Sequence, residues 1–277
     1  MNTAGSKKTG RIILVFLIIL ALLWVSPIWL ILSNSLKSLI EIYKNPLGAP
    51  IDVQFNNYVE TLEALNYPKA LMNSVLVAAI AEIMLVFFGS AAAYKLARVQ
   101  TRLSKAIFYL LIITMLVPFQ VIMIPLYKMI NDLNLNNNIF ALSFVYMGLN
   151  LPLAIFLFHG SIQSIPREMD EAALMDGCND FQIYCKIIIP MLIPCTITVV
   201  VLSLITIWNE YFIATLMIGD KDMYTLPLFA MNFVSKYLKK WNLQLPAIVL
   251  SALPIVVFYF GMQKHVVKGI SDGAIKG

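Results

Sequence analysis

Six long blocks of apolar residues, each bounded by polar or charged residues, dominate the pattern of the chain. A helix of about 20 apolar residues crosses the roughly 30 Å of hydrocarbon in a bilayer, and each block has about that length. A transmembrane β-strand needs only about 10 residues of alternating pattern, whereas these blocks are longer and uninterrupted. We therefore expect an all-α membrane protein with six spanning helices. Their approximate bounds are Ile12–Leu32, Ala70–Ala93, Ala106–Tyr127, Ile139–Phe158, Ile187–Trp208 and Leu245–Met262.

Two of the segments between these blocks are long enough to hold structure of their own. Residues 33–69 contain Pro46, Gly48 and the string FNNY (Phe55–Tyr58), and residues 218–244 mix acidic and basic side chains. We expect short interfacial helices and turns in both segments. Since neither could hold a soluble domain, residues 1–277 are one predicted transmembrane domain. Prolines in the blocks act either as packing kinks or as bending points; they are Pro27, Pro118, Pro125, Pro152, Pro194 and Pro254.

The composition supports a membrane location for the blocks. Of the 277 residues, 60% are hydrophobic and only 13% are charged, whereas soluble domains average about 25% charged residues. The first block follows Lys7, Lys8 and Arg11, as the apolar core of a secretory signal would. It is longer than such a core and ends without a small-x-small cleavage motif, so we expect a retained first helix.

Basic residues predict the orientation of the helices. The short segment between the second and third blocks carries Lys95, Arg98, Arg102 and Lys105 and no acidic residue. Short loops rich in lysine and arginine stay on the cytoplasmic side, and six crossings place both termini on that side. Basic residues at membrane edges also account for the net charge of +5, so no nucleic-acid partner is expected.

Few side chains suggest catalysis or metal binding. Cys178, Cys185 and Cys195 form no Cys-x-x-Cys pair and are odd in number, so we expect them to be reduced and structural. His159 and His265 stand alone, which predicts no metal site. The chain lacks the phosphate-binding loop of ATPases and the zinc-protease and serine-hydrolase motifs. We therefore expect no enzymatic activity in this chain.

Two polar sites in the blocks are candidates for the transport pathway. Glu82 lies near the centre of the second block, where a charge costs at least about 2.5–3.5 kcal/mol. It therefore either lines a cavity or contacts substrate as a carboxylate, or it is a neutral glutamic acid hydrogen-bonded between helices. The string WNEY provides Trp208, Asn209 and Glu210 near the outer end of the fifth block. An aromatic ring beside hydrogen-bonding groups suits a sugar, and an ordinary aromatic belt at the interface suits the same pattern.

An acidic segment separates the fourth and fifth blocks, on the predicted cytoplasmic side. We call residues 166–190 the elbow. Acidic residues follow Pro166, as at a helix N-terminus, and Gly177 suits the left-handed residue that ends a helix. Asn179 or Asp180 can cap a second helix. Spacings of three and four predict one shared face, made by Met169, Ala172, Ala173 and Asp176.

The predicted object is a short helix–turn–helix that lies tangential to the membrane. Its small residues would let another surface approach closely, so a partner protein could grip the elbow and move it. An amphipathic interfacial helix without a partner fits the residues as well, although anionic membrane surfaces favour basic helices.

The segment EAALMDGCNDFQIYCKIIIP (Glu171–Pro190) resembles the EAA loop of permease subunits in binding-protein-dependent ABC importers. The positions that match the family pattern are Glu171, Ala172, Ala173, Asp176, Gly177, Ile187 and Pro190. The chain departs from it mildly at Cys178, Tyr184 and Ile189. The strings NSLKSLIEIYKNP, NSV, GSAAAYKLAR, WNEY and GAIKG resemble the carbohydrate-uptake branch, most of all the maltose-type inner permease with six spans.

The resemblance implies the rest of a transport machine. A second permease subunit would complete the pathway, giving a heterodimer in the plasma membrane of a prokaryote. Two copies of a cytoplasmic ATPase, which bind ATP and Mg, would dock on the EAA loops, and an extracellular solute-binding protein would deliver a sugar. This chain would bind no cofactor itself. The tail from Lys264 is a further candidate contact with the ATPase, as similar tails are.

Two other classes of protein are alternatives to the importer. A self-sufficient ion-coupled carrier would use Glu82 and Glu210 as its intramembrane carboxylates. An integral-membrane enzyme is disfavoured, because no nucleophile, base or metal ligands cluster in the sequence.

Overall fold

The computed structural model describes residues 3–236 and 240–274, and every regular element in these ranges is a helix. The side chains of Lys7, Lys8, Arg11, Lys264 and His265 lie outside the described residues. The chain divides into two compact units. Unit 1 comprises Met1–Tyr67 and Ala230–Leu253, and unit 2 comprises Pro68–Phe229 and Pro254–Gly277.

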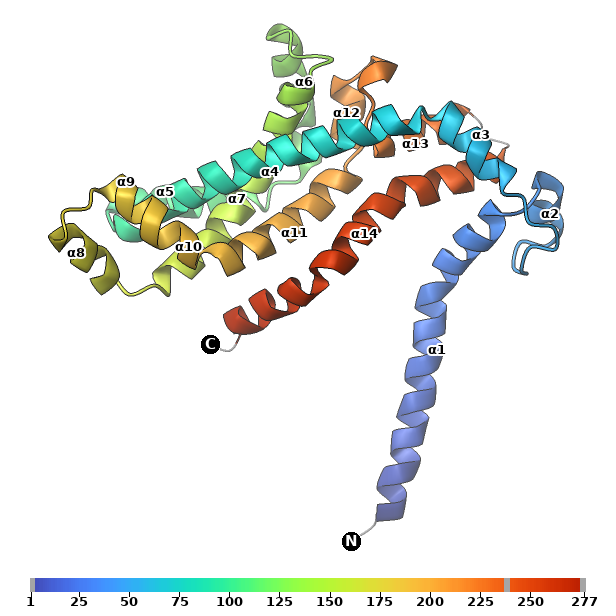
Figure 1. Ribbon diagram of the computed structural model, residues 1–277, viewed down its shortest axis with the longest axis horizontal. Coiled ribbons are helices and arrows are strands. Elements are labelled where there is room, and N and C mark those ends of the chain that lie inside the picture. The colour runs from blue at the N-terminus through green and yellow to red at the C-terminus, as the bar shows by residue number, and fades with distance from the viewer. Residues whose placement is uncertain (1–2, 237–239, 275–277) are drawn as a thin grey trace. The chain divides into compact units, whose positions relative to one another are not determined.

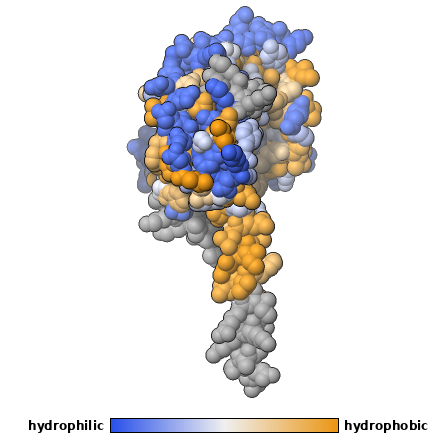
Figure 2. Space-filling view, turned by 90° about the vertical axis from the view of Figure 1, so that its right-hand side faces the viewer, coloured by the Kyte–Doolittle hydropathy of each residue, from blue (hydrophilic) through white to orange (hydrophobic). Residues whose placement is uncertain are grey.

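Unit 1 begins with α1 (Thr3–Ser35), whose apolar side chains are exposed along the helix. Figure 2 shows them as a column of hydrophobic surface, as expected of a helix that faces lipid. The short helices α2 (Leu39–Lys44) and α3 (Asn56–Ala64) follow, so the prediction of short helices in residues 33–69 is confirmed. Unit 1 also contains the second part of α13 (Leu226–Lys236) and the first part of α14 (Trp241–Ala274).

A buried lysine organises the turn after α1. Lys37 is buried, and its ammonium group donates to Asn34 Oδ1 at 3.0 Å and to the carbonyl oxygens of Asn45 and Gly48 at 2.7 Å each. A buried ammonium is tolerated only when its donors are satisfied. This network explains why the string NSLKSLIEIYKNP combines asparagine, lysine and turn residues.

Unit 2 is a bundle built around three long helices, α4 (Tyr67–Arg98), α7 (Ile139–Gln163) and α11 (Ile193–Asn209) (Figure 1). Its core includes Leu85, Ile155, Phe158 and Val199. Helix α4 approaches α7 closely at Gly89, where a Cβ atom would lie 3.3 Å from the Cβ of Ala154. The other α-helices of unit 2 are α5 (Arg102–Thr114), α6 (Phe119–Asp132), α8 (Glu168–Met175), α9 (Asp180–Ile183), α10 (Ile189–Met191), α12 (Phe212–Met217), the first part of α13 and the second part of α14.

The described residues contain four unbroken helices long and apolar enough to span a membrane, Ile13–Ser35, Tyr67–Arg98, Ile139–Gln163 and Trp241–Gln263. Two further candidates are bent pairs of helices, and the number of candidate spans rises to six if each pair counts once. The fourth predicted block begins where α7 does, at Ile139, because Asn138 caps the helix by accepting from the backbone N–H of Ala141.

The third and fifth blocks are bent pairs of helices, so whether each forms one span stays a prediction, and prolines of these blocks lie at or beside the bends. Helices α5 and α6 meet at a bend of 101°, where Pro118 lacks an N–H and disfavours helical geometry in the residue before it. The second bend, of 73°, lies at Leu192, between α10 and α11. Pro190 and Pro194 flank it, and a five-residue π-helix, Tyr184–Ile188, precedes it.

Candidate functional site

The elbow has the predicted helix–turn–helix form. Helix α8 carries three acidic residues in its first turn, where they complement the helix dipole. It ends at Gly177, whose φ is +82°. The N–H of Gly177 donates to Leu174 O at 3.0 Å and that of Cys178 to Ala173 O at 2.9 Å, which is the Schellman pattern. The predicted left-handed glycine is confirmed.

A reciprocal capping box starts the second helix of the elbow. The side chain of Asn179 accepts from the backbone N–H of Gln182, and the side chain of Gln182 accepts from the backbone N–H of Asn179, both at 2.9 Å. Asn179 is therefore the cap, and Asp180 is left for another contact. Farther along, Ile187 is half-buried against the core and Pro190 is exposed at the start of α10.

The predicted single face of the elbow is split. Ala173 is buried in the core beside Ile183, whereas Ala172 is exposed. Neighbouring positions on a helix point about 100° apart, so two consecutive alanines cannot both lie flush on the outside. Large apolar side chains are exposed on the elbow, with Met175 at 89% and Phe181 at 69%.

The acidic residues of the elbow fall into two groups. Asp170 pairs with Arg98, whose Nε lies 2.6 Å from Asp170 Oδ2, and Asp180 pairs with Lys95. Three other carboxylates have no hydrogen bond or ion pair with any residue that the structure describes. They belong to Glu168, Glu171 and Asp176, and all three residues are exposed.

Glu82 makes a hydrogen bond to another helix and also lines a cavity. Its side chain is only 8% exposed, and Ser203 Oγ on α11 donates to Glu82 Oε1 at 2.7 Å. Oε2 has no hydrogen-bond partner among the described residues. The carboxyl group also lines a hollow of about 380 Å³ together with Val86 and Thr196. Glu82 thus joins two helices and borders a cavity.

Two side chains of the WNEY segment have different environments. Trp208 is only 7% exposed, so its ring is buried in the described structure. Asn209 is exposed and donates to Ile205 O within its own helix. A contact of either residue with cargo stays a prediction.

Glu210 connects three helices. Its carboxylate accepts from the backbone N–H groups of Phe212 at 3.0 Å and Ile213 at 2.9 Å, at the start of α12. The hydroxyl of Tyr146 on α7 donates to the same carboxylate at 3.0 Å. A carboxylate that accepts three donors is satisfied in place, so Glu210 has a structural role in holding α12 between α11 and α7.

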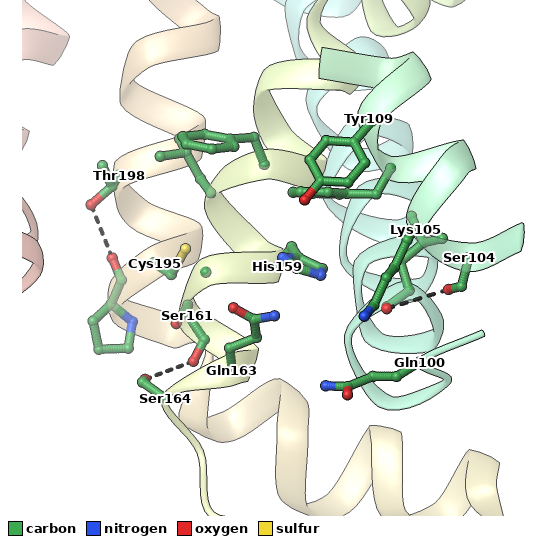
Figure 3. Close-up of a pocket in the computed structure, with 16 residues that line it drawn as sticks. Gln100, Ser104, Lys105, Tyr109, His159, Ser161, Gln163, Ser164, Cys195 and Thr198 are labelled. Atoms are coloured by element: carbon green, nitrogen blue, oxygen red, sulfur yellow. Dashed lines mark hydrogen bonds between the residues drawn. The ribbon is translucent and has the colours of Figure 1, made fainter. Parts of the chain in front are cut away.

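A pocket of about 850 Å³, not recognised in the sequence, lies between α5, α7 and α11 (Figure 3). Lys105 and Tyr109 line it on one side and Cys195 and Thr198 on the other, with His159 between them. The His159 ring stacks on Phe108 with centroids 3.9 Å apart. Aromatic faces beside hydroxyl and amide groups can bind a sugar ring and its hydroxyls.

A second hollow of about 770 Å³ is lined by α5, α6, α7, α11 and α12, and it includes Gln120, Asn150 and Glu210. Both hollows share α5, α7 and α11, so this side of unit 2 is concave along much of its length. No sequence motif marks it, because its lining comes from segments far apart in the chain.

Comparison with known proteins decides the family. Residues 69–272 match the family described as the binding-protein-dependent transport system inner membrane component. The chain belongs to this family. The resemblance found in the elbow is therefore confirmed, and the chain is an ABC transporter permease and a multi-pass membrane protein.

Relatives match the permease over nearly its whole length. It is 39% identical to the probable starch degradation products transport system permease protein AmyC of Thermoanaerobacterium thermosulfurigenes, over 96% of this chain and 97% of AmyC. It is 34% identical to the melibiose/raffinose/stachyose import permease protein MelC of Bacillus subtilis, over 99% of each chain. A chain of a bacterial ABC transporter that imports the acidic polysaccharide alginate has a TM-score of 0.81 and 25% identity, covering 95% of this chain and 98% of that one.

The structure brings together only some of the residues that the sequence singled out. The EAA-loop residues share the elbow, and Ala173 and Ile187 fix it to the body of the permease. Glu82 and Glu210 border different hollows, so they do not form one site. The contacts of the elbow with Lys95 and Arg98 were missed, since both residues were assigned only to the basic loop.

Proposed function

We propose that this permease is the translocation subunit of an ATP-driven importer of a sugar or oligosaccharide. It forms half of the pathway with a second, related permease, and two copies of a separate ATPase drive it through the elbow. A solute-binding protein on the opposite side of the membrane delivers the sugar. Membership of the family and the names of the relatives AmyC and MelC support the cargo class.

The observation that carries the coupling role is the outer surface of the elbow. Glu168, Glu171 and Asp176 are exposed and unpaired within the described residues, and Met175 and Phe181 are exposed next to them in the chain. Methionine and aromatic residues are enriched in protein–protein interfaces. Free carboxylates around them add charge complementarity, which selects a partner and fixes its orientation.

The concave side of unit 2 is the proposed wall of the pathway. Its two hollows, of about 850 and 770 Å³, offer aromatic rings with amide and hydroxyl groups. Because one permease supplies only one wall, a second permease has to close the pathway. A solved alginate ABC transporter in complex with a periplasmic protein that carries an alginate pentasaccharide has a similar fold, with a TM-score of 0.68 at 12% identity.

Reconstitution of the permease tests the proposal. With its second permease, ATPase and binding protein in proteoliposomes, we expect uptake of a labelled starch- or raffinose-type oligosaccharide only when ATP and Mg²⁺ reach the ATPase. The permease alone should show no uptake under a proton or sodium gradient. Gradient-driven uptake without the ATPase would instead support the ion-coupled carrier.

A further inference from the structure

The last turn of α4 is attached to the elbow by two ion pairs. Arg98 Nε lies 2.6 Å from Asp170 Oδ2 in α8, and the two side chains are only 12% and 13% exposed. Arg98 Nη1 also donates to Ile165 O at 3.2 Å, just before α8. Lys95, one helical turn earlier, pairs with Asp180 at the start of α9, with side chains 57% and 64% exposed. Each helix of the elbow is therefore tied separately to the same end of α4.

Apolar contacts lie between these charged pairs. The rings of Tyr94 and Tyr184 have centroids 5.5 Å apart, and Ser90 and Tyr184 share a hydrogen bond between hydroxyl groups at 2.7 Å. Ala97 and Ala173 are buried in the same core cluster. Figure 1 shows α8 and α9 at the end of unit 2 where α4 stops. The contact is broad, so the elbow is not joined to the bundle by its chain connections alone.

The positive-inside rule does not explain this arrangement. The rule asks only that basic residues lie on the cytoplasmic side, and Arg102 satisfies it while remaining exposed and unpaired within the described residues. Burying Arg98 would cost free energy unless its charge were paired. Its pairing with Asp170, 72 residues away in the chain, meets that requirement and joins the end of α4 to α8.

We propose that Arg98, assisted by Lys95, is a positioning residue that makes the elbow and α4 move as one body. Helix α8 has only eight residues and is followed by a glycine turn, so the ion pairs reinforce the apolar contact against bending of this turn when the outer surface of α8 is pushed. Helix α4 is unbroken over 32 residues, or about 48 Å at 1.5 Å per residue. A displacement at Arg98 therefore reaches Glu82 and the packing of Gly89 against α7.

This inference rests on the proposed function and divides the acidic residues of the elbow by role. Asp170 and Asp180 transmit motion inside the permease, whereas Glu168, Glu171 and Asp176 are free to meet the ATPase. The two groups give different expected defects. Loss of a free carboxylate weakens docking, and loss of the inner pairs leaves docking intact and breaks its connection to transport.

Charge exchange in the assembled transporter tests the inference. For Arg98→Asp and Asp170→Arg singly, we expect the ATPase to remain bound and sugar uptake per ATP hydrolysed to fall about tenfold, a typical size for coupling between sites. The double variant should regain most of the uptake, because the ion pair is restored in reverse. Arg102→Asp, with the same charge change in the same loop, should leave uptake unchanged. Wild-type uptake in both single variants would overturn the proposal.

A distance measurement tests it without relying on a charge reversal that could prevent folding. Spin labels at the exposed positions Val99 and Leu174, with the three native cysteines replaced by serine, measure the distance between the elbow and the end of α4. We expect the same distance in the nucleotide-free transporter and in the transporter trapped with an ATP analogue. A shift of the distance between these two states would contradict the proposal.

The variant Glu171→Lys separates this inference from the proposed function. It should lose co-purification of the ATPase, whereas Glu60→Lys, an exposed acid on α3, should retain it. Loss of the ATPase in Glu171→Lys with normal uptake in the Arg98 variants would reject the mechanical connection alone. Normal ATPase binding and uptake in Glu171→Lys would count against docking on the elbow.

Discussion

At the scale of single residues, the structure shows contacts of Glu210 that the string WNEY does not reveal. Its neighbours in WNEY suggested a contact with cargo or an ion-coupling carboxylate. In the structure its carboxylate oxygens accept hydrogen bonds from two backbone N–H groups and from the Tyr146 hydroxyl. The signal that could have revealed this is an acidic residue just before a short apolar helix, where a carboxylate can accept from the free N–H groups of the first turn.

Substitution of Glu210 distinguishes a structural carboxylate from an ion-coupling group. Glu210→Ala should lower the stability of the permease by about 1–3 kcal/mol, because two backbone N–H groups and the Tyr146 hydroxyl lose their acceptor. Glu210→Gln keeps one acceptor oxygen and should retain most ATP-driven uptake. Thermal unfolding in detergent and uptake in proteoliposomes measure the two effects, with Asn209→Ala as a control expected to be neutral. Complete loss of uptake in Glu210→Gln, with normal stability, would favour the carrier.

At the scale of elements, the sequence predicted the elbow closely but not the sharp bends inside two of the apolar blocks. Gly177 and Asn179 mark the turn and the cap through backbone geometry and hydrogen bonds that involve only a few neighbouring residues. The blocks at 106–127 and 187–208 are as apolar as the others, yet they bend at Pro118 and Leu192. Hydrophobicity indicates burial in lipid but does not indicate continuity, and a proline in a membrane helix is often tolerated without a break.

The turn at Gly177 should be sensitive to substitution. Its φ of +82° is disfavoured for a residue with a Cβ atom, at a cost of about 1–2 kcal/mol, so Gly177→Ala should reduce ATP-driven uptake moderately. Gly177→Pro also removes the N–H that bonds to Leu174 O and should abolish uptake while the permease still inserts. Uptake and membrane content are the measurements.

Gly261→Ala is the matched control for the turn. Gly261 lies inside α14, where an added Cβ would meet no atom within 4 Å, so its uptake should match the wild type. Normal transport by Gly177→Pro would mean that the shape of this turn does not matter for coupling.

At the scale of the whole molecule, the family membership and the apolar helices both indicate a multi-pass permease. Which loops lie on the cytoplasmic side of the membrane stays a prediction. The basic loop between α4 and α5 predicts that the elbow lies inside the cell. The loop after α1, organised by Lys37, would then face outward. The side of the membrane on which the elbow and the loop after α1 lie can be tested with single cysteines at exposed positions.

Labelling in intact cells and in inverted vesicles tests this orientation. In a background without native cysteines, Met175→Cys, 89% exposed on the elbow, should react with a membrane-impermeant maleimide only in inverted vesicles. Ile51→Cys, 84% exposed in the loop after α1, should react only in intact cells. The opposite pattern would place the elbow out of reach of any cytoplasmic ATPase.

The sequence by itself determined the membrane class, the position of most helices, the turn of the elbow and the family. These features depend on the length of apolar blocks, on one glycine and on caps, all of which act over a few neighbouring residues. Only the tertiary structure decided which acids of the elbow are free, because Asp170 meets Arg98 from 72 residues away. It likewise decided the burial of Trp208, the bends and the concave side of unit 2. These depend on packing between distant segments, which no local pattern records.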